Sequence, residues 1–124
     1  MIWPLFLACT TPCTLVSNVA DYQPICEDAV LAQYGDESRL VVPSDSGALV
    51  AYLPGDLSEE TYGGTSGNPL TILLDLDGGT SFAQARSSHV TIARLDLYDA
   101  ELQITASFEA GTIEGPLFVD VTQR

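Results

Sequence analysis

The sequence predicts a mainly β protein, a small antiparallel β-sandwich or partly open barrel with one short N-terminal helix. Three observations support this fold class. Short runs of alternating apolar and polar residues recur along the chain, most clearly over residues 101–110. Segments rich in glycine, serine and aspartate separate these runs, as turns do between strands. The chain of 124 residues is 46% hydrophobic, which is enough for one modest core.

The one predicted helix covers residues 21–35, DYQPICEDAVLAQYG. Its apolar residues recur at roughly helical spacing. Asp21 is suited to cap the start, Pro24 is tolerated in a first turn, and Gly35 supplies a stop. We expect this helix to cover one end of the sheet.

Two short strands and a long loop are predicted next. The strands are RLVVP (39–43) and ALVAYL (48–53), separated by a polar turn. Residues 54–68 are polar and glycine-rich without periodicity, so we expect a loop, and loops of this length are often functional or mobile. Tyr62 lies in this loop and is a candidate contact for a protein or sugar partner. The alternative is a tyrosine with a purely structural role.

Two further strands are predicted on either side of an irregular connection. LTILLDLD (70–77) alternates apolar and polar residues, and residues 78–88 are expected to form a loop. The apolar alternation of residues 89–99 changes phase halfway along the segment. Since a shift of one residue turns the inward side chains outward, this change predicts a β-bulge near Ala93 and Arg94.

The last third of the chain is predicted to be a three-stranded antiparallel meander. ELQITASFEA (101–110) alternates cleanly, and GPLFVDVT (115–122) continues the pattern. Tight connections are expected at residues 99–100 and 111–115. The strand and loop layout of residues 70–122 also loosely resembles uncharacterised all-β domains of secreted bacterial proteins, a resemblance that implies no particular function.

The charge of the chain narrows the range of partners. Its 17 acidic residues against four arginines and no lysine give a net charge of −13. A polyanion repels phosphate backbones, so the sequence predicts no nucleic-acid binding, and it offers no basic patch for an anionic membrane. The acids are scattered, which favours solubility through self-repulsion over a dedicated site for a cation or a basic partner.

The N-terminal stretch MIWPLFLACTTPC contains an unbroken apolar run, residues 2–8. The run is too short to span a bilayer, since a transmembrane helix needs about 20 residues. It matches a short signal-peptide core and ends in Phe6-Leu7-Ala8-Cys9. This sequence resembles a bacterial lipoprotein signal, in which a Leu-(Ala/Ser)-(Gly/Ala)-Cys box ends at the acylated cysteine. Here Phe6 replaces the usual leucine, and Leu7 is larger than the usual small residue.

The resemblance implies that Cys9 carries a diacylglyceryl group and becomes the N-terminus after cleavage. It divides the chain into a signal-like segment (1–8), a linker (9–20) and a single mainly β domain (21–124). It also implies export and a lipid anchor in the cell envelope. Thr10 is not the aspartate that retains some lipoproteins at the inner membrane, which favours the outer membrane. Ordinary secretion with another cleavage site, or an uncleaved strand with a buried Cys9, are the alternatives.

The chain has three cysteines, Cys9, Cys13 and Cys26. If Cys9 carries lipid, Cys13 and Cys26 remain as an even pair that could form a disulfide in an oxidising compartment. Two free thiols are the main alternative. A metal or catalytic role is less favoured because no C-x-x-C spacing occurs.

The nearest approach to a metal motif is DLDGG (75–79). It departs from an EF-hand loop at the glycine and glutamate positions. A looser calcium site could combine Asp75 and Asp77 with Asp99 and Glu101, because a hard cation would relieve the repulsion among their carboxylates. The alternative is a strand end with solvated acids.

No recognised catalytic motif surrounds the only histidine, His89, so a solvated residue at a strand start is the simpler interpretation. The sequence predicts no cofactor. We therefore expect a small acidic envelope lipoprotein with a non-catalytic binding or structural role and a possible protein or glycan partner. One alternative is a periplasmic enzyme inhibitor or small enzyme that uses residues 54–68. Another is a calcium-dependent adhesion module.

Overall fold

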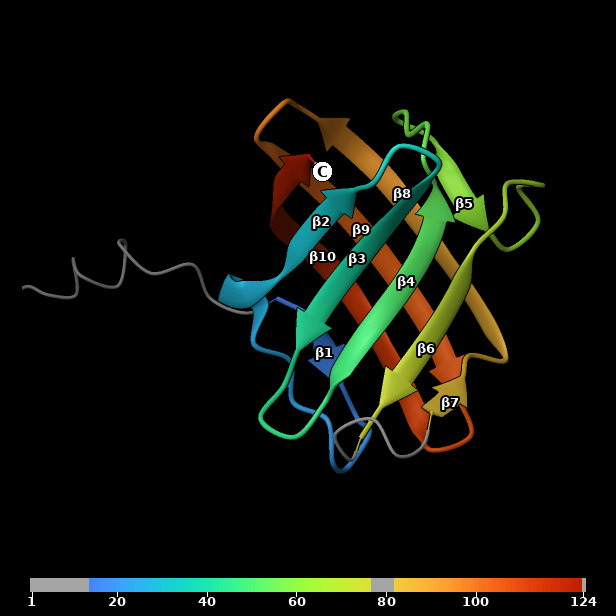
Figure 1. Cartoon of the computed structure of the whole chain (residues 1–124). Coiled ribbons are helices and arrows are strands. Elements are labelled where there is room, and N and C mark those ends of the chain that lie inside the picture. Colours follow the sequence, from blue (N-terminus) through green and yellow to red (C-terminus); the bar gives the residue numbers. More distant parts are fainter. Residues whose placement is uncertain (1–13, 77–81, 124) are drawn as a thin grey trace, which may run out of the picture.

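The chain forms a mixed β-sheet of ten strands that curls into a half-barrel (Figure 1). The computed structural model describes residues 14–76 and 82–123. The strand order is β5-β8-β9-β10-β2-β3-β4-β6-β7, and β1 pairs with β10 outside this path. The mainly β, partly open barrel predicted from the sequence is therefore confirmed. The expectation of a purely antiparallel sheet is wrong, because β2 runs parallel to β10.

The elements have the following bounds. The strands are β1 (Val16–Ser17), β2 (Val30–Gln33), β3 (Glu37–Pro43), β4 (Ala48–Pro54), β5 (Thr61–Gly63), β6 (Thr71–Asp75), β7 (Phe82–Gln84), β8 (Ser87–Leu95), β9 (Asp99–Phe108) and β10 (Gly111–Gln123). A single 3₁₀ turn, η1, covers Cys26–Asp28 in the described part of the chain.

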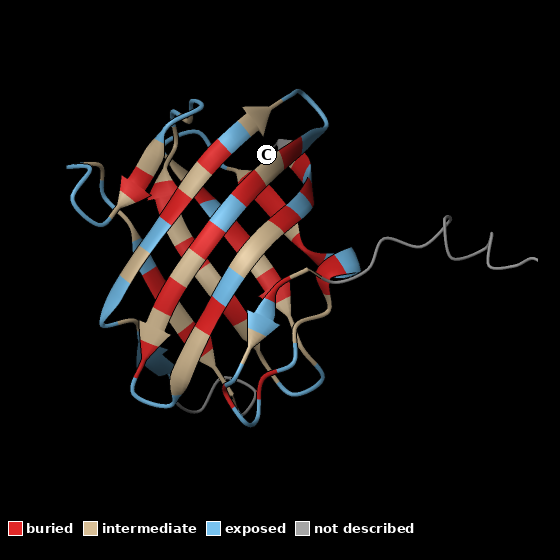
Figure 2. Cartoon of the chain, turned by 180° about the vertical axis from the view of Figure 1, so that it is seen from behind, coloured by how far each residue is buried: buried red, intermediate tan, exposed pale blue. Residues whose placement is uncertain are grey.

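Strands β2, β3, β4 and β6 form one wall of the half-barrel, and β8, β9 and β10 form the other (Figure 1). We call them the front wall and the back wall. Along most strands of both walls, buried residues alternate with more exposed ones, which produces the striped pattern of Figure 2. The buried side chains of both walls pack into one core. Its largest fully buried members are Val19, Tyr22, Leu31, Leu40, Leu49, Ile72, Leu74, Ile92, Leu102, Ile104, Ile113 and Leu117.

The helix predicted over residues 21–35 is wrong. The segment holds only the 3₁₀ turn η1 and then strand β2, which pairs with both β3 and β10. Pro24 offers no backbone N–H to a helix, and Leu31 is buried between the walls. The two ladders satisfy the backbone of β2 on both sides, so the sheet overrides a weak helical periodicity.

The domain also begins earlier than the sequence predicted. Residues 14–20 belong to the predicted linker, but Val16 and Ser17 form β1 against β10. Leu15 and Val19 belong to the core. Apolar side chains at this spacing on an extended segment allow one face to be buried while the backbone pairs with a neighbour.

Tyr22 anchors this N-terminal segment inside the half-barrel. Its side chain is fully buried, and its hydroxyl donates a hydrogen bond of 2.8 Å to the carbonyl oxygen of Val42. Burial raises the pKa of the Tyr22 hydroxyl well above its usual range. The bond satisfies a polar group that would otherwise be costly inside the core.

Strand β3 contains the strand predicted at 39–43, and β4 contains the strand predicted at 48–53. Strand β6 lies within the segment predicted as a strand at 70–77. The predicted bulge is confirmed, since the register between β8 and β9 shifts between Ile92 and Arg94.

Several segments that the sequence predicted as connections contain strands instead. The predicted loops 54–68 and 78–88 contain the short strands β5 and β7. Residues 99–100 begin β9, and residues 111–115 begin β10. Within residues 14–76 and 82–123, no helix has the length and apolar character needed to cross a bilayer.

Candidate functional site

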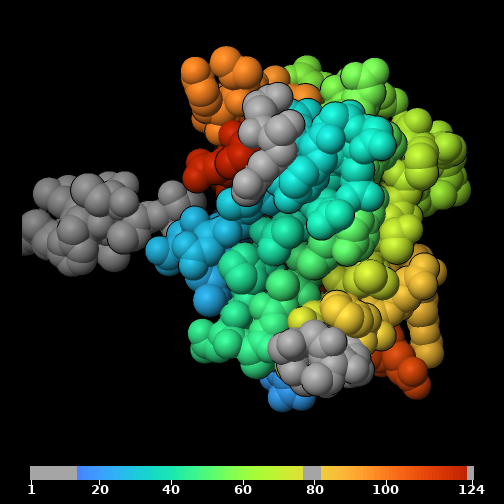
Figure 3. Space-filling model, in the orientation of Figure 1, coloured from blue at the N-terminus to red at the C-terminus, as the bar shows by residue number. Residues whose placement is uncertain are grey.

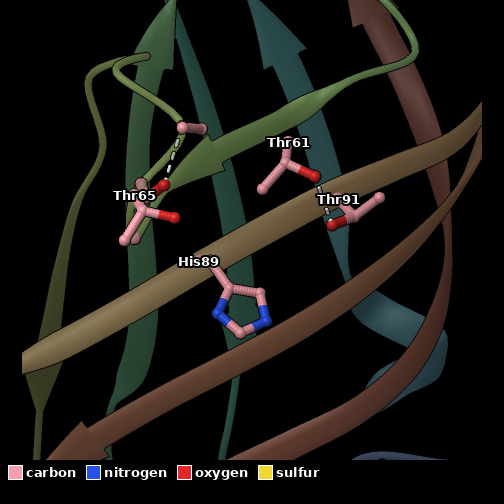
Figure 4. Close-up of a pocket in the computed structure, with 7 residues that line it drawn as sticks. Thr61, Thr65, His89 and Thr91 are labelled. Atoms are coloured by element: carbon pink, nitrogen blue, oxygen red, sulfur yellow. Dashed lines mark hydrogen bonds between the residues drawn. The ribbon is translucent and has the colours of Figure 1, made fainter.

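An open groove lies where the short strand β5 pairs with β8 (Figure 4). Its volume is about 410 Å³. We call it the β5–β8 groove. Its lining consists of Thr61, Gly63, Gly64, Thr65, Ser66, His89 and Thr91.

The strand register brings the groove residues together. Thr61 pairs with Thr91, and Gly63 pairs with His89. On β8 the intervening residue Val90 is buried, so His89 and Thr91 point to the outer side of the sheet. The hydroxyl oxygens of Thr61 and Thr91 are 2.8 Å apart and share a hydrogen bond, while His89 projects from the same strand beside them (Figure 4).

One end of the groove is a tight turn that follows β5. Gly63 has a φ of +79°, a conformation that glycine adopts without strain. A Cβ atom there would lie 2.6 Å from the Ser88 carbonyl oxygen, so glycine is also needed for close approach to β8. The amide nitrogen of Gly63 donates to the carbonyl oxygen of Asn68 at 2.9 Å, and that of Gly64 donates to Ser88 at 2.9 Å.

Side chains hold this turn in place. The Asn68 side-chain amide donates to the Thr61 carbonyl oxygen at 2.7 Å and to Glu60 Oε1 at 3.0 Å. The Ser66 hydroxyl donates to the Gly63 carbonyl oxygen at 2.7 Å and accepts from the Asn68 backbone amide at 3.1 Å. These bonds fix the turn before any ligand arrives, which lowers the ordering cost of binding.

The lining of the groove is polar. It offers hydroxyl groups and the His89 side chain, and none of its seven residues carries a carboxylate or a guanidinium. A Ser-His-acid triad needs a carboxylate that orients the imidazole. The lining supplies hydroxyls and an imidazole without that orienting acid, so the arrangement suits hydrogen bonding to a polar ligand.

Tyr62 is not the exposed contact residue that the sequence suggested. Its side chain is only 2% exposed and belongs to the core. Its hydroxyl accepts a hydrogen bond of 3.0 Å from the Ser58 amide. The outward residues of the same strand are Thr61 and Gly63, and the pattern Thr-Tyr-Gly in a short strand is the signal that could have identified them.

The three calcium-site candidates that the structure describes are not all brought together. Asp75 ends β6 at the bottom of Figure 1, whereas Asp99 and Glu101 lie at the start of β9, beside the β8–β9 turn at the top. Asp99 Oδ1 is 2.7 Å from Arg94 Nη1. Asp77 lies outside the described residues. In the described part of the chain, no three His, Cys, Asp or Glu side chains gather as metal ligands.

The cysteine predictions fall mostly on residues that are not described. Cys9 and Cys13 lie outside residues 14–76 and 82–123. Cys26 opens the η1 turn and is 8% exposed. Lipidation of Cys9 and pairing of Cys13 with Cys26 therefore stay predictions.

Comparison of the chain with models of protein families, with curated proteins and with solved structures finds no match.

Proposed function

We propose that this chain is a non-catalytic binding domain and that its ligand occupies the β5–β8 groove. The observation that carries the proposal is a hydroxyl-rich groove lining without carboxylate or guanidinium groups, in a chain with 17 acidic residues. The hydroxyls of Thr61, Thr65 and Thr91 both donate and accept hydrogen bonds, as the hydroxyls of a sugar do. A neutral glycan is the ligand class that this lining matches best.

The charge of the chain supports a neutral ligand over an anionic one. Anionic ligands are repelled by a net charge of −13, and the lining holds no arginine that would compensate. A cationic ligand would prefer carboxylates, and none of the seven lining residues carries one. A neutral glycan meets neither obstacle.

Isothermal titration calorimetry with soluble neutral oligosaccharides, and with uronic-acid oligosaccharides of equal length, tests this proposal. We expect binding of neutral members only. Thr61→Val and Thr91→Val keep side-chain shape but remove a hydroxyl, so each should weaken binding by about tenfold. Thr112→Val on β10 is the matched control and should bind like the original chain. Equal affinity in all variants, or no heat with any oligosaccharide, would sink the proposal.

We further propose that the domain is held at the cell envelope, in the outer membrane, by acylation of Cys9. The lipobox-like sequence Phe6-Leu7-Ala8-Cys9 supports this location. A single acyl chain binds membranes reversibly, whereas several anchor a protein stably. Metabolic labelling with palmitate should mark the original chain and not Cys9→Ser. Equal labelling of the variant would exclude the anchor at this residue.

We also propose a disulfide between Cys13 and Cys26. Cys26 is buried in the η1 turn, and Cys13 immediately precedes the first described residue, Thr14, whose hydroxyl donates to the Pro116 carbonyl oxygen on β10. A bond between the two would fasten the start of the chain to the sheet. Intact mass should rise by two hydrogens after reduction. An unchanged mass would exclude the bond.

A further inference from the structure

The outer surface of the front wall carries a continuous row of apolar side chains. By register, Val30 pairs with Val41, Val41 with Val50, and Val50 with Leu73. Their neighbours along each strand, such as Leu40 and Leu49, are buried in the core, so the row faces outward. All four side chains are partly exposed. We call this row, together with Pro43 and Ala48, the apolar outer face.

No other described strand covers this face. Figure 3 is viewed from the front wall, whose strands β3 and β4 appear in cyan and green at the centre of the molecule. An antiparallel sheet with one solvated face normally carries polar residues there. The row of valines and leucine departs from that pattern, which indicates a surface suited to contact with another apolar surface.

One end of the apolar outer face carries an arginine that lies between two tyrosines. The Arg39 guanidinium carbon lies 5.1 Å from the ring centre of Tyr34 and 5.4 Å from that of Tyr52. Its Nε atom is 2.6 Å from Glu37 Oε2, so the charges of the pair offset each other. Arginine and tyrosine are enriched among the residues that dominate protein interfaces.

Charge decides which partner suits this face. Two copies of a chain with a net charge of −13 repel each other wherever acids meet. Among the described outward positions of β2, β3, β4 and β6, the acids are Glu37, paired with Arg39, and Asp75 at the end of β6. The back wall presents Glu101, Glu114 and Asp120 outward, beside the half-exposed Phe118. A cationic partner would therefore prefer the back wall.

We propose that the apolar outer face is the contact surface between two copies of this chain. The front walls would pack face to face about 10 Å apart, as the sheets of a β-sandwich do. A two-fold axis would place the same row of each copy against the other, which makes the surface self-complementary. The β5–β8 groove belongs to the β5–β8 edge and would stay open in this dimer.

Sedimentation equilibrium of the full chain over a range of concentrations tests the proposal. We expect a reversible dimer. Val50→Glu places a like charge in each half of the contact and should raise the dissociation constant by at least about a hundredfold. Gln103→Glu adds the same charge to an exposed position of the back wall and should leave the dimer intact.

A second variant distinguishes weaker dimerisation from a folding defect. Val50→Thr keeps the branched shape suited to a strand, and a thermal melt reports whether each variant is folded. We expect folded Val50→Thr to dimerise more weakly than the original chain. A chain that stays monomeric at every concentration would overturn the proposal. So would a dimer that Val50→Glu and Gln103→Glu weaken equally, because its contact would lie elsewhere.

Discussion

The two walls of the half-barrel are built alike on the inside and differ on the outside. Inside, each wall contributes alternating apolar side chains to one shared core. Outside, the front wall presents Val41, Val50 and Leu73, whereas the back wall combines polar residues such as Gln103 and Thr105 with the half-exposed Phe118. The inner positions need apolar volume to form the fold. The outer positions do not have to be apolar for the chain to fold. The two walls can therefore carry different outer residues, which allows the two surfaces separate roles.

The largest expected effect comes from emptying an inner position. Leu102→Ala on β9 should lower the free energy of unfolding by about 2–5 kcal/mol, because the Leu102 side chain is 1% exposed and its removal leaves a cavity. Urea denaturation measures the loss. The next residue, Gln103, points outward, and Gln103→Ala should change stability by less than about 0.5 kcal/mol. Similar losses in the free energy of unfolding at both positions would contradict the difference between the inner and outer faces of the wall.

A smaller loss is expected at the rim of the groove. Gly63→Ala should cost about 3 kcal/mol, because it combines a positive φ with a Cβ atom 2.6 Å from the Ser88 carbonyl oxygen. Gly67 has a φ of +84°, but no atom lies within 4 Å of the place that a Cβ atom would occupy, so Gly67→Ala should cost only about 1 kcal/mol. Urea midpoints of the two variants give the difference. Equal costs would mean that contact with β8 does not hold the turn.

Removing the Tyr22 hydroxyl should have a moderate effect. Tyr22→Phe leaves the Val42 carbonyl oxygen without this donor and should cost about 1–2 kcal/mol at neutral pH. Tyr98→Phe is the matched control, because the Tyr98 side chain is 77% exposed. Its stability should stay close to that of the original chain in urea denaturation at the same pH.

The same hydroxyl makes stability depend on alkaline pH. Burial raises the pKa of Tyr22 in the folded state, so above a pH of about 10 the unfolded chain loses this proton while the folded chain retains it. The free energy of unfolding contributed by this group is therefore complete below about pH 10 and falls as the pH rises further. The stability difference between the original chain and Tyr22→Phe should narrow over that range. A constant difference would contradict the burial of the hydroxyl.

The smallest effect is expected at the outer charges. Arg39→Gln removes the bond to Glu37 and the contacts with Tyr34 and Tyr52, all on an exposed surface. Exposed ion pairs contribute little to stability and are screened by salt. The urea midpoint of the monomer, measured at a protein concentration below the dimer dissociation constant, should therefore stay nearly unchanged. A loss as large as that of Leu102→Ala would show that the outer face also supports the fold.

The sequence predicted the long strands well and the short ones poorly. Alternation over residues 101–110 identified the buried Leu102, Ile104, Ala106 and Phe108 correctly. The three-residue strands β5 and β7 have no such pattern of their own and form because a longer neighbour pairs with them. The helix predicted over residues 21–35 failed for a related reason, since β2 owes its conformation to two distant strands.

The candidate site could be predicted only in part. His89 and Tyr62 both stand out in the sequence, but Tyr62 is buried while its neighbour Thr61 lines the groove, because burial alternates along β5. The hydrogen bond between Thr61 and Thr91 joins residues 30 positions apart. Local patterns do not report such non-local contacts, which depend on the packing of the complete sheet.

The central claim is that the two outer faces have different partners, a neutral glycan at the β5–β8 groove and a second copy at the front wall. Mapping backbone amide shifts by NMR during titration with a bound neutral oligosaccharide tests it most directly. We expect shifts at Thr61, His89 and Thr91 and none at Val41 or Val50. Shifts centred on Val41 and Val50, with Thr61 and Thr91 unmoved, would contradict this claim.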